Sequence, residues 1–221
     1  MTLVLRRLVL VAAPLTLAVV LWFHPPGGEN VYAGVREDVG AWLFVHAAFL
    51  FFTPLLAIAA YLLLSGLQSR AAAVSRVALV FFLVFYTAYE VTVGVGTGIL
   101  VDYANGLPAA EQAAVAGAIQ DYNRNAILAD PSISMVLGGF GWVVAMLAAA
   151  IAFHRAGAGW PVTLLVGFSS LFAIHPPPVG PVALACFASA AVLLERARAA
   201  HPHPLARPPA PTGLTPTETA T

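Results

Sequence analysis

Residues 77–101 read VALVFFLVFYTAYEVTVGVGTGILV, an apolar run that carries a single carboxylate, Glu90. A helix crosses a hydrocarbon core of about 30 Å with roughly 20 apolar residues, so this run is long enough to span a bilayer. An ionisable side chain inside such a span is costly and is expected to face protein rather than lipid. Glu90 is therefore the first candidate for a functional residue.

Composition places the whole chain in the same class. Of its 221 residues, 60% are hydrophobic and 9% are charged, and the mean hydropathy is +0.87, which excludes a soluble domain of this length. The alternation of a membrane barrel strand is missing, so the apolar runs are expected to be helices. The expected partner is the lipid bilayer, and no nucleic acid is expected to bind.

Six apolar runs approach the length of a span. They cover residues 8–23, 41–64, 77–101, 133–153, 161–174 and 182–194. The first, fifth and sixth runs are short and are expected to extend into their flanks. We predict an all-α integral membrane protein in which residues 1–198 form a bundle of six transmembrane helices, with an external amphipathic helix.

The external helix is predicted between the third and fourth spans, over residues 108–123. Pro108 suits a first helical position, and residues at helical spacing follow it. These residues are Glu111, Val115, Ile119 and Tyr122. We expect this helix to pack as a lid on the outer surface of the bundle.

The arginines orient the spans. With the N-terminus in the cytoplasm, only Arg36 and Arg124 fall outside, as the positive-inside rule requires. The arginines on the inner side are Arg6, Arg7, Arg70, Arg76, Arg155, Arg196, Arg198 and Arg207. Both termini are therefore predicted to be cytoplasmic, with residues 199–221 as a disordered tail rich in Pro, Ala and Thr. The abundance of Ala, Gly, Pro and Val and the absence of Lys are typical of a GC-rich bacterial genome, so we expect a bacterial plasma membrane.

Glu90 has a structural and a functional interpretation. Pro54 has no amide hydrogen, so the carbonyl of Leu50 loses its helical partner. A protonated Glu90 at a similar depth would satisfy that carbonyl. In the functional interpretation, Glu90 exchanges a proton, binds a cation or acts as a general acid.

The other polar residues of the outer half define a candidate pocket around Glu90. Helical rise places them within a few turns of its level. They are His46, Tyr86, Thr53, Thr97 and Ser169. His46 is the candidate base, and we expect the helix over residues 108–123 to close the pocket.

Two further histidines stand in similar short sequences. Phe23-His24-Pro25-Pro26 and Ile174-His175-Pro176-Pro177 each follow an outward span. His24 and His175 would meet His46 if the first, second and fifth helices were neighbours. No HxxxH pair or paired mid-span histidine supports a metal or haem there, so we expect neither a metal nor another cofactor.

Glycines on the third span suggest a helix contact. Gly94 and Gly98 form a small-xxx-small pair that allows close approach of a neighbouring helix. Gly138, Gly139 and Gly141 on the fourth span are the predicted mate.

Absent residues narrow the enzyme classes. The chain has no Lys for a Schiff base and no HExxH for a metalloprotease. Three classes stay open. They are proton- or cation-coupled transport of a small molecule, an enzyme acting on a lipid or apolar substrate with Glu90 as general acid, and a non-catalytic accessory or assembly subunit. The expected ligand is small and apolar or cationic, and the expected protein partner is another membrane protein or a second copy of the chain.

Overall fold

The computed structural model describes residues 2–125 and 132–200, and every regular element in these two ranges is helical. In chain order the elements are α1 (Leu3–Arg7), η1 (Leu8–Ala12), α2 (Ala13–Leu21), α3 (Val31–Val35), α4 (Val39–Leu63), α5 (Arg70–Phe81), η2 (Phe82–Tyr86), α6 (Thr87–Tyr89), η3 (Glu90–Gly96), α7 (Thr97–Asn105), α8 (Ala109–Asn123), α9 (Ile133–Arg155), α10 (Trp160–Phe168), η4 (Ser169–Ala173) and α11 (Val179–Ala200). The all-α prediction is confirmed for this part of the chain. The predicted tail lies outside the described residues from position 201 onward.

Five helical stretches are long and apolar enough to cross a membrane. They are Val4–Leu21, Val39–Leu63, Arg70–Asn105, Ile133–Arg155 and Val179–Ala200. The first and last extend into their flanks, as expected. Trp160–Ala173 stays shorter, because Pro176, Pro177 and Pro178 cannot continue a helix and restrict the residues before them.

Hydroxyl and amide side chains start several of these helices. Ser69 and Ser132 accept hydrogen bonds from backbone amides in the first turns of α5 and α9, and Asn30 does the same for α3. Such caps satisfy amides that have no partner inside the helix. At the other end of α9, Gly157 has a positive φ of 86° and turns the chain toward α10.

Large apolar side chains cover the outside of the bundle. Each long helix and α10 has at least one that is more than half exposed. Examples are Val19, Phe51, Val80, Phe140, Leu164 and Val182. A surface of this kind on every side is typical of helices that face lipid.

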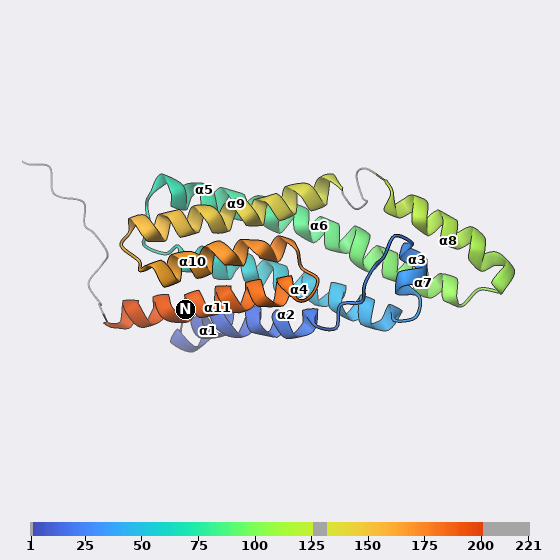
Figure 1. The fold of residues 1–221 in the computed structure, drawn as a ribbon, viewed down its shortest axis with the longest axis horizontal. Coiled ribbons are helices and arrows are strands. Elements are labelled where there is room, and N and C mark those ends of the chain that lie inside the picture. The colour runs from blue at the N-terminus through green and yellow to red at the C-terminus, as the bar shows by residue number, and fades with distance from the viewer. Residues whose placement is uncertain (1, 126–131, 201–221) are drawn as a thin grey trace, which may run out of the picture.

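Most of the described arginines gather at one end of the bundle, whereas Arg36 and Arg124 follow α3 and α8. Glu195 on α11 forms ion pairs with Arg6 (2.9 Å) and Arg198 (2.8 Å). Arg76 donates to the carbonyls of Leu64, the C-cap of α4, and of Leu67, in the connection to α5. We call this the arginine end. Figure 1 shows α3, α7 and α8 together at the opposite end, which we call the α8 end.

Unequal helix lengths determine where the functional site lies. Arg70–Asn105 contains 36 residues and reaches roughly 50 Å, whereas Val4–Leu21 contains 18 and reaches roughly 27 Å. The longer helix therefore projects past the end of the first, and α3 and α8 pack on its projecting part (Figure 1). The shorter helices end beside the middle of the long one, near Glu90.

The prediction that Gly94 and Gly98 on the third span contact the glycines of the fourth span is wrong. Gly138 and Gly141 on α9 do contact the third span, but they lie against the backbone of Tyr86 and Phe82, in the preceding turns. Gly94 lies against the His46 ring on α4. The two sets of glycines therefore face different neighbours, because the third span packs α9 on one side and α4 on the other.

Candidate functional site

Four polar side chains meet where the shorter helices end. Glu90 begins η3, and His46 lies on the facing side of α4. His24 follows α2, and His175 follows η4. We call these four residues the histidine–glutamate cluster. The elements that hold it are neighbours because α2 packs against both α4 and α11, and η4 packs against α9 and α11.

His46 and Glu90 form a buried pair. Nδ1 of His46 lies 2.7 Å from Oε2 of Glu90, and the two side chains are 3% and 0% exposed. Oε1 of Glu90 and Nε2 of His46 have no hydrogen-bond partner among the described residues. The predicted bond from Glu90 to the Leu50 carbonyl is therefore not formed. Glu90 is satisfied by a histidine of α4 one turn nearer the α8 end.

His175 and His24 extend the cluster. Nδ1 of His24 donates to the carbonyl of Pro25 over 2.7 Å, which leaves its Nε2 as an acceptor. Nε2 of His175 lies 3.2 Å from that atom and so donates to it. Nδ1 of His175 then accepts from the hydroxyl of Tyr86 over 2.9 Å. Tyr86 precedes Glu90 by one turn on the third span and interacts electrostatically with its carboxyl.

Aromatic side chains fix the ring positions. Trp42 donates from Nε1 to the Gly94 carbonyl over 2.7 Å, and its ring centre lies 4.3 Å from that of His46. On the other side, Phe49 lies 5.2 Å from the His175 ring. The absence of a side chain at Gly94 leaves the space in which the His46 ring sits. The His46 ring therefore packs against Trp42, and the His175 ring packs against Phe49.

The two outer histidines are neutral at pH 7. Burial and the neighbouring His46 lower the pKa of His24 from 6.5 to about 4. Burial, followed by His24 and His46, also lowers the pKa of His175 well below its ordinary value. Removal from water disfavours a charged imidazole, and three adjacent rings could not all be protonated. His24 and His175 therefore each offer a lone pair.

Helix α9 and the chain before α11 leave a groove beside this cluster. Its volume is about 420 Å³. Tyr86, Tyr89 and His175 line one part of it, and the rest is apolar. The apolar lining includes Val136, Phe140 and Ile174, which are more than half exposed on the lipid-facing surface. The groove therefore connects this surface with the Tyr86–His175 pair.

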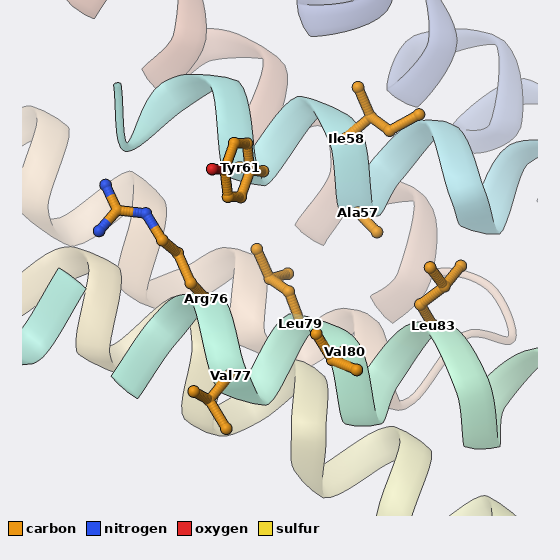
Figure 2. A pocket seen from close by; sticks show the side chains of 8 residues that line it. All are labelled: Ala57, Ile58, Tyr61, Arg76, Val77, Leu79, Val80 and Leu83. Carbon is orange, nitrogen blue, oxygen red and sulfur yellow. The ribbon is translucent and has the colours of Figure 1, made fainter. Parts of the chain in front are cut away.

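A second groove lies between α4 and α5 near the arginine end. Figure 2 shows its lining, which is apolar except for Tyr61 and Arg76. Its volume is about 440 Å³. Arg76 is already bonded to two backbone carbonyls and lies over the Tyr61 ring at 5.8 Å. This groove is therefore an apolar gap between two helices, and its one charged side chain is already bonded.

Three predicted pocket residues lie apart from the cluster. Thr97 donates to Asn123 on α8, and Ser169 donates to the Val166 carbonyl within its own helix. Thr53 is buried two turns beyond His46, toward the arginine end, and its hydroxyl has no partner among the described residues. Helical rise alone could not show these differences, because the helices are offset along the bundle axis.

Helix α8 is attached to the third span by side-chain hydrogen bonds. Tyr122 donates to the Thr92 carbonyl over 2.8 Å, and Asn123 accepts from Thr97 over 3.1 Å. Gln120 accepts from the Val31 amide and so ties α8 to α3. These bonds hold α8 against the projecting part of the bundle, next to the cluster.

The repeated His-Pro sequence marks His24 and His175, two cluster residues that the sequence analysis did not include in the candidate pocket. His24 and His175 both join His46, because the first and fifth apolar helices end beside α4, about two turns after its first residue. Within residues 2–125 and 132–200, no group of three or more His, Cys, Asp or Glu side chains is placed so that it could hold a metal ion as the side chains stand.

The chain matches no protein-family model, and no curated protein or solved structure shows significant similarity to it. Its function must therefore be inferred from the cluster and the groove.

Proposed function

We propose that this protein is a membrane-embedded enzyme that acts on an amphipathic small molecule at the histidine–glutamate cluster. The observation that carries this proposal is the groove of about 420 Å³ that ends at Tyr86 and His175. Ligand pockets commonly have volumes of about 300–1,000 Å³ and combine apolar walls with a few converging polar groups. This groove has both properties.

The lining of the groove indicates how the ligand is oriented. Val136, Phe140 and Ile174 would contact an apolar tail or ring system that arrives from the lipid. The polar head of the ligand would then meet Tyr86 and His175, which can donate and accept hydrogen bonds. Because the groove opens sideways, a substrate reaches the cluster without crossing the bundle. This geometry favours an enzyme over coupled transport.

The packing of Glu90 argues against a purely structural subunit. A bond between Glu90 and the Leu50 carbonyl would have favoured that class, and Glu90 is paired with His46 instead. A buried acid–imidazole pair with two unsatisfied atoms is costly to maintain for packing alone. Such groups concentrate at functional sites.

We also propose that the arginine end faces the cytoplasm and that Trp160–Ala173 completes a sixth crossing. The positive-inside rule supports this orientation. Trp160–Ala173 reaches only roughly 21 Å, and the segment that carries His175 would continue it to the far surface. In this arrangement α8 is external, the cluster lies near the outer boundary of the bilayer, and the membrane is a bacterial plasma membrane.

Cysteine labelling from intact cells tests the orientation. A cysteine placed at Gln112 on α8 should react with an impermeant maleimide, whereas one placed at Gly157 at the arginine end should not. The reverse pattern would overturn the proposed topology.

Photolabelling tests the ligand site. A long-chain alcohol that carries a diazirine should label the groove-lining part of α9 in the purified protein. Gly139→Trp should abolish this labelling, since the groove borders Gly139, whose nearest contact for an added Cβ is 3.9 Å away. Gly167→Trp is the matched control, because Gly167 on α10 faces open space and does not line the groove. Equal labelling of both variants would refute the proposed ligand site.

A further inference from the structure

The three imidazole rings of the cluster are mutual neighbours. The ring centres of His24 and His175 lie 5.0 Å apart, and those of His24 and His46 lie 5.1 Å apart. The His46 and His175 rings are 6.4 Å apart. Three elements that are distant in sequence thus bring three imidazole rings together.

Each histidine is held through its Nδ1 atom by a different oxygen. His24 uses the Pro25 carbonyl, His175 uses the Tyr86 hydroxyl, and His46 uses the Glu90 carboxylate. The Nε2 atoms of His24 and His175 lie against each other, and Nε2 of His46 is buried with no partner in the described part of the chain. Histidines that bind a metal are usually anchored in this way, by a carboxylate, carbonyl or other oxygen on the nitrogen away from the metal.

The spacings can be compared with those of a metal site. Zinc binds imidazole nitrogen at about 2.0–2.1 Å in tetrahedral geometry, so two ligand nitrogens lie about 3.3 Å apart and their ring centres about 5.1 Å apart. The Nε2 atoms of His24 and His175 are 3.2 Å apart. Two of the three ring separations also match this geometry. Only the distance between His46 and His175 is too long, by about 1.3 Å.

We propose that His24, His46 and His175 bind one divalent transition-metal ion of the Zn²⁺ class through their Nε2 atoms, with Glu90 as the residue that positions His46. Imidazole nitrogen suits zinc, copper, iron and nickel. Three histidines leave the fourth position of a tetrahedral ion open, as in catalytic rather than structural sites. No thiolate is available to close it, since Cys186 lies on α11 outside the cluster.

Metal binding requires the His46 and His175 rings to approach each other by about 1.3 Å, together with a rearrangement of hydrogens. The hydrogen on Nε2 of His175 must move to its Nδ1, which then donates to the oxygen of Tyr86. The Tyr86 hydroxyl hydrogen then needs an acceptor, and Oε1 of Glu90 is buried and unpartnered. The interaction between Tyr86 and Glu90 supplies that partner. The metal-bound arrangement thus satisfies the two atoms of the His46–Glu90 pair that are unsatisfied without it.

Cobalt titration tests the site on the full chain. The protein is purified in detergent, stripped with a chelator and titrated with Co²⁺, whose visible absorption reports tetrahedral nitrogen coordination. His201→Gln and His203→Gln are introduced as a background, so that the tail histidines do not contribute. We expect saturation at one Co²⁺ per chain and displacement by Zn²⁺. If this protein, with its cluster unchanged, gave no saturable tetrahedral spectrum, the inference would be overturned.

Variants then identify the ligands. His24→Ala and His175→Ala should each abolish the cobalt spectrum, whereas His154→Ala should retain it, since His154 stacks on Trp160 at the arginine end. Glu90→Gln should weaken Co²⁺ affinity by roughly 10–100-fold, as expected for a residue that orients a ligand. Each variant is first shown to be monodisperse, and loss of binding in His154→Ala as well would contradict the assignment.

The two proposals can fail separately, although they share the cluster. Gly139→Trp should block photolabelling of the groove and leave the cobalt spectrum intact. A protein that is labelled in the groove but gives no cobalt spectrum would retain the ligand site and exclude the metal.

Discussion

Replacing Gly94 by alanine probes the centre of the cluster with one methyl group. A Cβ at this position would lie 2.6 Å from Cγ and 2.9 Å from Cβ of His46, whereas ordinary contacts begin at 3.4 Å. Nδ1 of His46 would lie closer still, so the ring would have to move by more than about 0.8 Å. It is 3% exposed and is held between the Trp42 ring and the Glu90 carboxylate, so no free space receives it.

The size of the effect follows from these contacts. Overpacking a filled interior destabilises the folded state by about 1–3 kcal/mol. Replacing a helical glycine by alanine stabilises the helix by about 0.5–1 kcal/mol, which offsets part of that cost. We expect Gly94→Ala to lower the free energy of unfolding by about 1–2 kcal/mol. For a chain of this size, that lowers the midpoint of thermal unfolding by roughly 2–8 °C.

Thermal unfolding in detergent, followed by near-ultraviolet circular dichroism, measures this shift. Gly139→Ala is the matched control, because its nearest contact would be the Ala173 Cβ at 3.9 Å. The control should unfold at or above the wild-type temperature. If Gly94→Ala were as stable as Gly139→Ala, the His46 ring could not be packed against the third span, and the geometry of the Glu90 pair would be wrong.

Two further substitutions test contacts outside the cluster. Thr97→Val removes the hydrogen bond to Asn123, at a cost of about 1 kcal/mol. It should speed proteolytic cleavage within α8 in nanodiscs, and an unchanged cleavage rate would mean that this bond does not hold α8. Ser75→Ala removes a buried 2.8 Å bond to the Ala145 carbonyl between α5 and α9 and should also cost about 1 kcal/mol. Ser65→Ala, which removes an exposed bond, should leave the unfolding temperature unchanged, and equal effects of the two serine variants would contradict the buried contact.

The site also suggests how metal and substrate would be arranged. Tyr86 and His175 belong both to the groove and to the hydrogen bonds of the cluster. A ligand head placed against them would therefore lie next to the open metal position. This arrangement suits a metal ion that polarises a bond of the bound head group or activates a water molecule beside it.

The fold class could be predicted because it depends on local properties of the chain. Apolar length fixes which residues can form a membrane-crossing helix, and it identified the long stretches from Val39–Leu63 to Val179–Ala200. Proline placement also acts locally, and it explains why Trp160–Ala173 ends early. Glu90 was recognised for the same reason, since a single carboxylate in an apolar run is visible without knowledge of its neighbours.

Offsets between helices could not be predicted in the same way. Counting residues from the predicted span ends placed His46 nearer the level of Thr97 than of Glu90, yet His46 and Glu90 are bonded. The third span is longer than the bilayer requires. Its π-helical segment η2 precedes Glu90 and its segment η3 begins with Glu90, and both alter the rotation of the helix faces. The depth of a residue along its own helix therefore does not predict which residue of another helix it contacts.

Sequence alone thus determined that this chain is an apolar helical bundle with an acid buried in its third span, because hydrophobicity, charge and proline act over a few turns of one helix. Only the tertiary structure decided that Glu90 pairs with His46 rather than with the Leu50 carbonyl, and that His24 and His175 join them. Those contacts connect residues up to 151 positions apart. They depend on which helices pack together and where each one ends, and no local pattern specifies either.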